Sequence, residues 1–303
     1  MANLHASVAS LPQLHSLQVQ RGDEILFAEA PRGQGLDQFA NIKSCSKSIV
    51  ALLLGTTIDR REILSVSSTL QQVAPGILPN NATAGAGDIT MEDLVTLRAG
   101  LERTSGRNYG AWVASGNWLD YALTRPMVNE PGTGMLYSTG STHILGAALA
   151  EATGQSLLNL ARERIGIPLG IEIPPWTRDP QGYYFGGNEM AMRPTAMLKV
   201  AKLLCDRGMF EGNQVISRRW MEASLTPRTR SPWSGLDYGY GWFLTQSGYV
   251  FARGYGGQVI AANPAHDLAV AITSDLMRPA RSAGYFGELI RLLEGPVLAL
   301  ALT

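Results

Sequence analysis

Residues 238–275, YGYGWFLTQSGYVFARGYGGQVIAANPAHDLAVAITSD, contain four short apolar runs separated by turn residues. Short runs rich in β-branched and aromatic side chains, bounded by glycine, proline or aspartate, are typical of strands. The turns fall near Gly248, at 254–257 and at 264–266. This spacing predicts an antiparallel meander, because consecutive strands joined by short turns pair with each other.

The start of the chain predicts two more strands. Residues 15–30, HSLQVQRGDEILFAEA, alternate around Arg21-Gly22-Asp23, which indicates a hairpin. Between the two strand regions the pattern is mostly helical, with glycine and proline loops. Helices are predicted over 44–58 with Ser44 as its N-cap, from Thr90, over 141–153, 194–207 and 217–224, and again over 282–295.

Strands at both ends with helices between them favour an α/β (α+β) fold, in which one antiparallel sheet is built from both chain ends. We expect residues 1–60 and 235–303 to form the sheet domain. Residues 61–234 would form an inserted, mainly helical domain. The active site would lie between the two.

Composition excludes several function classes. The 303 residues carry 25 basic and 25 acidic side chains, so the formal net charge is zero. Strong electrostatic binding to nucleic acid or to an anionic membrane over a broad surface is therefore not expected. The two cysteines, Cys45 and Cys205, are too few for a disulfide scaffold, and the four histidines show no metal-binding spacing. The first twenty residues lack the pattern of a secretory signal, so we expect a cytoplasmic protein. We expect neither a metal nor an organic cofactor.

One hydrolase motif is present, the S-x-x-K of Ser44-Cys45-Ser46-Lys47. Residues three apart on a helix share a face, so the lysine amine would meet the serine hydroxyl. Burial could lower the pKa of Lys47 from about 10.4 into the range of a useful base. An N-capping serine followed by a solvated lysine fits this short pattern equally well.

Two later segments extend the motif. Residues 131–140, PGTGMLYSTG, form a glycine-rich loop with Tyr137, and residues 252–258, ARGYGGQ, lie at the edge of a predicted strand. In this order the three segments resemble the serine β-lactamase and penicillin-recognising family. The match runs from about residue 20 to 275 and is most similar to the branch of class C-like esterases and 6-aminohexanoate-dimer hydrolases.

The resemblance implies a role for each motif. Ser44 would be the nucleophile that forms an acyl-enzyme. Lys47 would take the serine proton or hold Tyr137 in its ionised form, and Tyr137 would relay the proton to the leaving group. Which of the two is the base stays open. The backbone N–H groups of Ser44 and Tyr255 would form the oxyanion hole.

The sequence departs from the family pattern around the substrate. Thr139 replaces the asparagine of the second motif, and Ala252-Arg253-Gly254 replaces Lys-Thr-Gly or His-x-Gly. The missing lysine or histidine argues against β-lactam turnover, although Arg253 could partly replace it. We assign substrate binding to four residues: Thr139, Arg253, Gly254 and Trp176.

These observations predict a serine hydrolase of small carboxylic esters or linear amides, with a small-molecule substrate as its partner. A β-lactamase or DD-peptidase is the alternative within the enzyme class. A non-catalytic binding protein on the same fold is the alternative outside it, although Ser44, Lys47 and Tyr137 are all present. The sequence predicts neither the natural substrate nor the oligomeric state.

Overall fold

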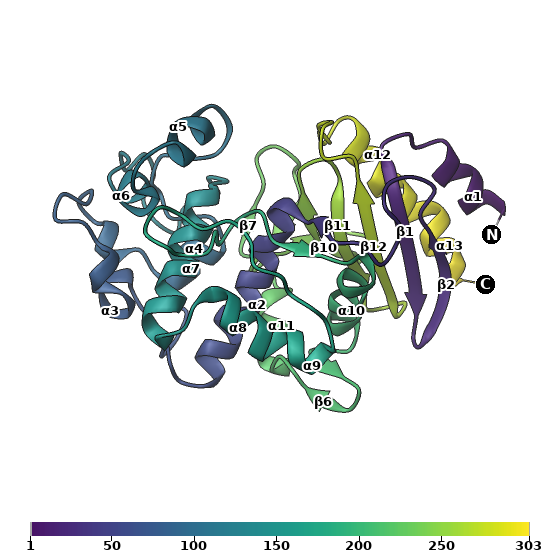
Figure 1. Cartoon of the computed structure of the whole chain (residues 1–303), viewed down its shortest axis with the longest axis horizontal. Coiled ribbons are helices and arrows are strands. Elements are labelled where there is room, and N and C mark those ends of the chain that lie inside the picture. The colour runs from purple at the N-terminus through teal and green to yellow at the C-terminus, as the bar shows by residue number, and fades with distance from the viewer. Residues whose placement is uncertain (1, 303) are drawn as a thin grey trace.

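The computed structural model describes residues 2–302, and its centre is an antiparallel sheet (Figure 1). The strand order is β2-β1-β12-β11-β10-β9-β8-β7. The strands are β1 (Leu14–Arg21), β2 (Glu24–Glu29), β7 (Thr229–Arg230), β8 (Asp237–Tyr238), β9 (Phe243–Leu244), β10 (Val250–Gly254), β11 (Gln258–Asn263) and β12 (Leu268–Ser274). The N-terminal hairpin β1–β2 and the C-terminal meander are both present. They join where β1 pairs with β12, which confirms the predicted fold class.

Strand β12 shows how the sheet is covered on both faces, because side chains alternate along a strand. Its alanines, Ala269 and Ala271, belong to the core under α10 (Pro194–Cys205). The larger Val270 and Ile272 belong to the core under α12 (Tyr285–Leu292). Every residue of β12 is buried, as expected of a strand with helices on both sides.

Two elements of the sheet layer come from the predicted helical insert. Helix α10 packs on β12, β11 and β1, and β7 forms the last strand of the sheet. Both lie between residues 61 and 234. The apolar pattern predicted α10 as a helix, whereas β7 precedes the predicted strand region, which starts at residue 238. No local signal shows that either element joins the sheet layer.

A further group of helices forms a second part beside the sheet, on the left and in the middle of Figure 1. Its longest helix, α7 (Thr139–Thr153), is buried from Thr139 to Leu149 and stops at Gly154, which has a φ of +65°. The helices are α2 (Ser46–Asp59), α3 (Leu70–Val73), α4 (Met91–Val95), α5 (Tyr109–Val113), α6 (Trp118–Leu123), α7 (Thr139–Thr153), α8 (Leu157–Ala161), α9 (Ile167–Leu169) and α11 (Arg218–Ser224). Two short pairs, β3 (Ala40–Asn41) with β4 (Ala191–Met192) and β5 (Met209–Phe210) with β6 (Asn213–Gln214), complete this region.

The structure corrects the sequence analysis at the nucleophile motif and adds an element at the N-terminus. Ser44 does not cap a helix with its side chain; it lies inside the 3₁₀ turn η1 (Lys43–Cys45) that leads into α2. A helix that was not predicted, α1 (Ala2–Ala9), buries Leu4 and Val8 near α12 and α13 (Leu298–Ala301). Among residues 2–302, no helix is both long and apolar enough to cross a bilayer.

Candidate active site

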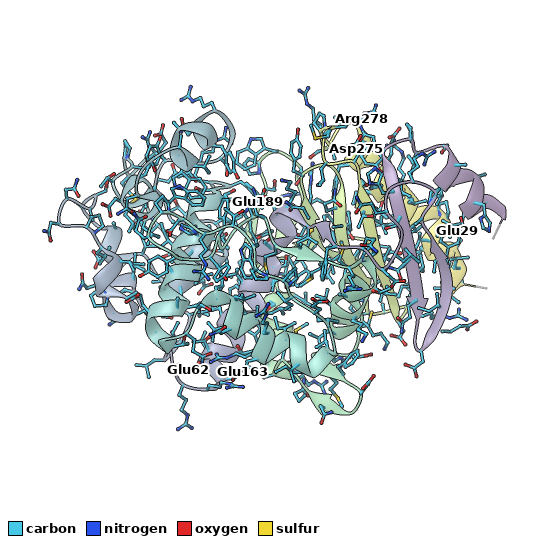
Figure 2. The ribbon with its side chains drawn as sticks, viewed as in Figure 1. Glu29, Glu62, Glu163, Glu189, Asp275 and Arg278 are labelled. Atoms are coloured by element: carbon cyan, nitrogen blue, oxygen red, sulfur yellow. The ribbon has the colours of Figure 1, made fainter. Side chains whose placement is uncertain are left out.

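Ser44 sits on a strained turn at the start of α2. The preceding residue, Lys43, has a φ of +50°, a left-handed conformation that is unfavourable for a side chain larger than glycine. One contact of its backbone and one of its side chain hold it there. Its N–H donates to Oδ1 of Asn41 at 2.9 Å, and its amine pairs with Glu189 at 2.7 Å. Glu189 lies at the junction of the sheet and the helical part (Figure 2).

Lys47 is buried behind Ser44 and is surrounded by neutral oxygen atoms. Its Nζ lies 3.1 Å from Ser44 Oγ, 3.2 Å from Thr139 Oγ1 and 2.7 Å from the Gly187 carbonyl oxygen. Only 3% of its surface is exposed, and no carboxylate among the described residues pairs with it. Burial lowers the pKa of Lys47 to about 7.

This set of acceptors orients a neutral amine. Neutral lysine has two N–H bonds and one lone pair. Gly187 and Thr139 can accept the two N–H bonds, which leaves the lone pair directed at the Ser44 hydroxyl. The same atoms can also receive all three N–H bonds of the protonated amine, so Lys47 can accept a proton without moving.

Tyr137 reaches Ser44 from the loop before α7. Lys47 Nζ lies 5.0 Å from the centre of its ring, and its hydroxyl hydrogen-bonds to Ser44. Burial raises the pKa of Tyr137, and the bond to Ser44 and the charge of Arg253 only partly oppose this rise. Tyr137 is therefore a neutral phenol near pH 7, where Lys47 titrates.

Ser44 and Tyr137 open into a cavity of about 290 Å³. Its other lining residues are Ser231, Trp233, Ser234, Phe243, Arg253, Gly254, Tyr255, Ala280 and Ser282. Trp233 and Tyr255 are 51% and 54% exposed, which is unusual for aromatic side chains that only support a core. They add exposed apolar surface to a cavity that also contains the polar side chains of Ser44 and Arg253.

Arg253 is the only charged residue lining this cavity, and no carboxylate among the described residues pairs with it. Its Nη1 donates to Ser282 Oγ at 2.8 Å and its Nη2 to the Ala280 carbonyl at 2.6 Å. The guanidinium also lies over the ring of Phe286, 3.8 Å from the centroid. Burial lowers the pKa of Arg253, but its ordinary value is so high that the group stays charged.

Gly254 brings the end of β10 against the nucleophile turn. A Cβ atom on this residue would lie 2.3 Å from the carbonyl oxygen of Ile42, so only glycine allows the approach. This close packing places Tyr255 on the same cavity as Ser44. The two backbone N–H groups proposed for the oxyanion hole therefore belong to residues on one cavity, and their role stays a prediction.

The structure brings together all but one of the predicted site residues. Thr139 contacts Lys47 from the start of α7, where Ser105 Oγ also lies 3.0 Å from its hydroxyl, so it supports the lysine and does not line the cavity. Trp176 lies elsewhere. Its indole N–H donates to the Phe185 carbonyl at 2.9 Å and its ring packs on Tyr184, so its predicted contact with substrate finds no support in this position.

Sequence reasoning missed Gly187 and Trp233. The carbonyl of Gly187 is a backbone group, and only the Gly186-Gly187 pair marks a place where chains approach closely. Trp233 comes from the loop between β7 and β8, 189 positions after Ser44 in the sequence. No spacing rule links the two residues.

Comparison with known proteins agrees with this geometry. The family model described as Beta-lactamase matches residues 17–294. The chain therefore belongs to the β-lactamase family, which confirms the resemblance inferred from its motifs. A search of curated protein sequences gives no significant match.

Solved structures show the same fold over nearly the whole chain. A protein described as a 6-aminohexanoate-dimer hydrolase from Bacillus anthracis has a TM-score of 0.80 at 16% identity, covering 99% of this chain and 81% of its own. EstCE1, described as a hydrolase with promiscuous acyltransferase activity, has 0.78 at 15%, covering 98% and 97%. A D-stereospecific amidohydrolase from Streptomyces sp. has 0.74 at 16%, covering 97% and 98%. At these identities the similarity establishes the fold, and the family assignment makes the chain a hydrolase of this class.

Proposed function

We propose that this protein hydrolyses small carboxylic esters or linear amides through an acyl-enzyme on Ser44. One observation carries the proposal. The amine of Lys47 is buried 3.1 Å from Ser44 Oγ, and neutral oxygen atoms occupy its other donors. A base with a pKa near the operating pH is the most effective proton acceptor, and burial brings Lys47 to that range.

The reaction would proceed in two halves. Neutral Lys47 takes the proton of Ser44 as Oγ attacks the carbonyl carbon, and the oxyanion forms beside the N–H groups of Ser44 and Tyr255. The leaving group then departs with the proton of the Tyr137 hydroxyl, and Tyr137 regains a proton from the ammonium group of Lys47. Water attacks the acyl-enzyme with Lys47 again as the base, and the acid leaves as Ser44 regains its proton.

The cavity suggests the kind of substrate. A volume of about 290 Å³ with Trp233, Phe243 and Ala280 on its walls suits a short apolar acyl or alcohol group. The descriptions of the structural neighbours, which include a hydrolase with promiscuous acyltransferase activity and an amidohydrolase, support acyl-transfer chemistry on ester and amide substrates. We also place the activity in the cytoplasm, because Cys45 and Cys205 are free thiols; cell fractionation tests this.

A second candidate is β-lactam or DD-peptide hydrolysis, which the position of Arg253 favours. A half-buried guanidinium on the wall of the cavity, which no carboxylate among the described residues pairs with, could bind a substrate carboxylate. The loss of the usual lysine or histidine at position 252 weighs against it.

The deciding experiment compares kcat/KM on a short-chain p-nitrophenyl ester with kcat/KM on a chromogenic cephalosporin, using Ser44→Ala as the blank. We expect ester turnover to dominate and to vanish in the variant. Faster cephalosporin turnover would favour the second candidate. Full ester activity in Ser44→Ala, or failure of a fluorophosphonate to label Ser44, would overturn the acyl-enzyme proposal, and the latter would favour a binding protein.

A further inference from the structure

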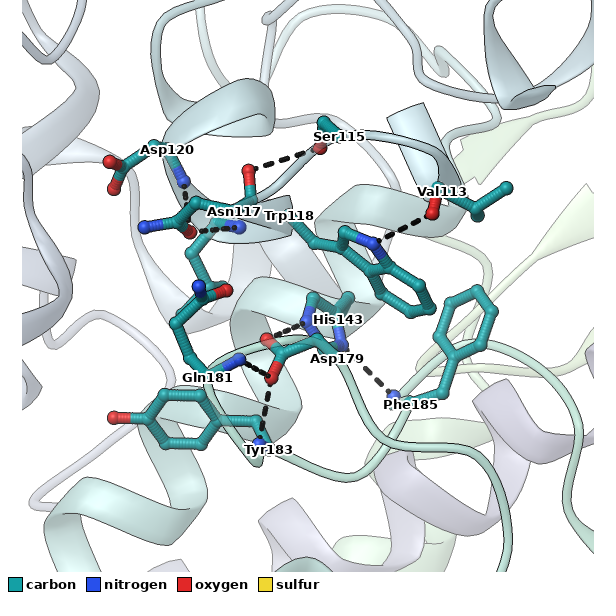
Figure 3. Close-up of polar contacts among 12 residues, drawn as sticks. Val113, Ser115, Asn117, Trp118, Asp120, His143, Asp179, Gln181, Tyr183 and Phe185 are labelled. Carbon is teal, nitrogen blue, oxygen red and sulfur yellow. Dashed lines mark hydrogen bonds and ion pairs between the residues drawn. The ribbon is translucent and has the colours of Figure 1, made fainter. Parts of the chain in front are cut away.

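A second polar cluster lies behind the site, formed by His143 of α7 and Asp179 (Figure 3). His143 Nε2 lies 2.9 Å from Asp179 Oδ2, and both side chains have 0% exposure. The other ring nitrogen, Nδ1, accepts the backbone N–H of Gly186 at 3.3 Å. Since Nδ1 accepts, the ring proton is on Nε2 and is donated to Asp179. The imidazole thus ties α7 to two points of one loop.

Asp179 in turn fixes the shape of that loop. Its Oδ1 accepts the backbone N–H groups of Gln181 and Tyr183 at 3.0 and 2.8 Å. The rings of Trp112, Trp118 and Phe185 surround His143 at centroid distances of 5.5 to 6.0 Å. The cluster is therefore shielded from water. In such a site hydrogen bonds are stronger and harder to replace than at the surface.

The cluster connects directly to the acceptors of Lys47. Gly187, whose carbonyl takes the shortest hydrogen bond from Lys47, follows Gly186 in the chain. Thr139, the other acceptor besides Ser44, lies one helical turn before His143 on α7. A Cβ on Gly186 would lie 2.4 Å from the carbonyl oxygen of Thr142, so the loop is pressed against the helix.

We propose that His143 and Asp179 are positioning residues that hold the Gly187 carbonyl against Lys47, so that the lysine lone pair stays aimed at Ser44. The inference rests on the proposed function, because it assigns the pair to the activation of that nucleophile. Neither residue lines the Ser44 cavity. The other titratable groups that face Lys47 are Tyr137 and Cys45, and burial raises the pKa of both, so neither carries charge near neutral pH.

Asp179→Asn tests the proposal. An asparagine that keeps its oxygen on Gln181 and Tyr183 presents an NH₂ group to His143. The ring must then accept at Nε2 and carry its proton on Nδ1, facing the N–H of Gly186. The loop loses this anchor, and with it the Gly187 carbonyl moves off Lys47.

The readout is the titration of Lys47 itself. The chain has only four lysines, so ¹³Cε-lysine NMR gives few signals, and Lys47→Met identifies the one of interest. A carbonyl acceptor favours the ammonium form, so its loss should lower the Lys47 midpoint by about 0.5–1 pH unit. The acid limb of kcat/KM should move with it, and the plateau should fall by about tenfold or more.

Glu62→Gln is the matched control. It breaks another pair of a buried and a half-buried side chain, Arg164–Glu62 at 2.7 and 2.8 Å, at the lower edge of the helical part (Figure 2). This variant should lose stability and leave the Lys47 midpoint unchanged. If Asp179→Asn does not fold, the double variant His143→Phe/Asp179→Asn replaces it, because it leaves no buried charge and fills the aromatic cage.

An unchanged or raised Lys47 midpoint in a folded variant would overturn the proposal, as would an equal shift in Glu62→Gln. The titration does not depend on turnover. A wild-type protein with no Ser44-dependent hydrolysis, but with a Lys47 midpoint that falls in Asp179→Asn, would defeat the proposed function and leave the positioning role standing.

Discussion

The amine of Lys47 lies 2.7 Å from the carbonyl oxygen of Gly187, closer than the 3.1 Å that separates it from Ser44 Oγ. The shortest hydrogen bond of the lysine is thus with a backbone carbonyl and not with the nucleophile. A base held in this way can exchange a proton with Ser44 while its own position stays fixed. Preorganisation of this kind lowers the cost of reaching the transition state.

The pH dependence of turnover should report Lys47. The amine must be neutral to accept a proton, so kcat/KM should rise with pH along an acid limb whose midpoint is about 7, the pKa to which burial lowers this group. Lys47→Met should lower kcat/KM by about 10²–10⁴-fold and remove the limb. Lys199→Met, which removes an amine that donates to the Leu169 carbonyl, is the control and should keep both. A limb that survives in Lys47→Met would assign it to another group.

Stability should also depend on the charge of Lys47. The pKa of this amine is about 7 in the folded protein and near 10.4 in the unfolded chain. Between these values the unfolded state binds more protons, so stability should rise as pH increases from 7 towards 10. The Tm of the wild type relative to Lys47→Met should therefore increase over this range. A constant difference would show that the amine keeps its ordinary pKa in the fold.

Tyr137→Phe should separate attack from departure of the leaving group. Its hydroxyl bonds to Ser44 and is protonated at neutral pH, because burial raises the pKa of Tyr137. Loss of this proton donor should cost about 10²-fold or more on an alkyl ester, whose leaving group needs a proton. A p-nitrophenyl ester should lose less, since p-nitrophenolate leaves unaided. Tyr121→Phe, which lies outside the cavity and keeps the ring that contacts Arg125, should behave as wild type on both. Equal losses on the two esters in Tyr137→Phe would argue against a relay.

Gly254→Ala should damage the site through its backbone. The added Cβ would lie 2.3 Å from the Ile42 carbonyl, so β10 must move away from the turn that carries Ser44. We expect a loss of about 1–3 kcal/mol in the free energy of unfolding and a lower kcat with the ester. Gly110→Ala is the control, because a Cβ there meets no atom within 4 Å. Denaturant unfolding and ester kinetics measure both, and wild-type behaviour of Gly254→Ala would refute the close approach.

Local patterns predicted much of this structure. The turns at Gly22 and at 254–257 lie where expected, and the helix predicted to start from Thr90 does so, with Thr90 and Asp93 forming a capping box. These features depend on residues close in sequence. The order of the three motifs likewise predicted that Ser44, Lys47 and Tyr137 belong together, and the structure places them in contact.

Other parts of the site depend on contacts that no local pattern encodes. The Gly187 carbonyl is a group that every residue possesses, and only the fold brings it to Lys47. Trp176 and Trp233 are equally aromatic in the sequence, yet one packs on Tyr184 and the other lines the cavity. The side to which each indole turns is decided by tertiary packing.

The pairing of β1 with β12 also has a consequence for synthesis on the ribosome. Leu17 lies opposite Ile272, so the hairpin has no partner on that edge until β12, at residues 268–274, has been translated. The two chain ends also emerge on the same side of the molecule (Figure 1). A circular permutant that links them and opens at an exposed loop would translate β12, the linker and the hairpin as neighbours. Such a chain should complete its sheet early and refold faster than the natural order, because the loop that closes this pairing becomes short.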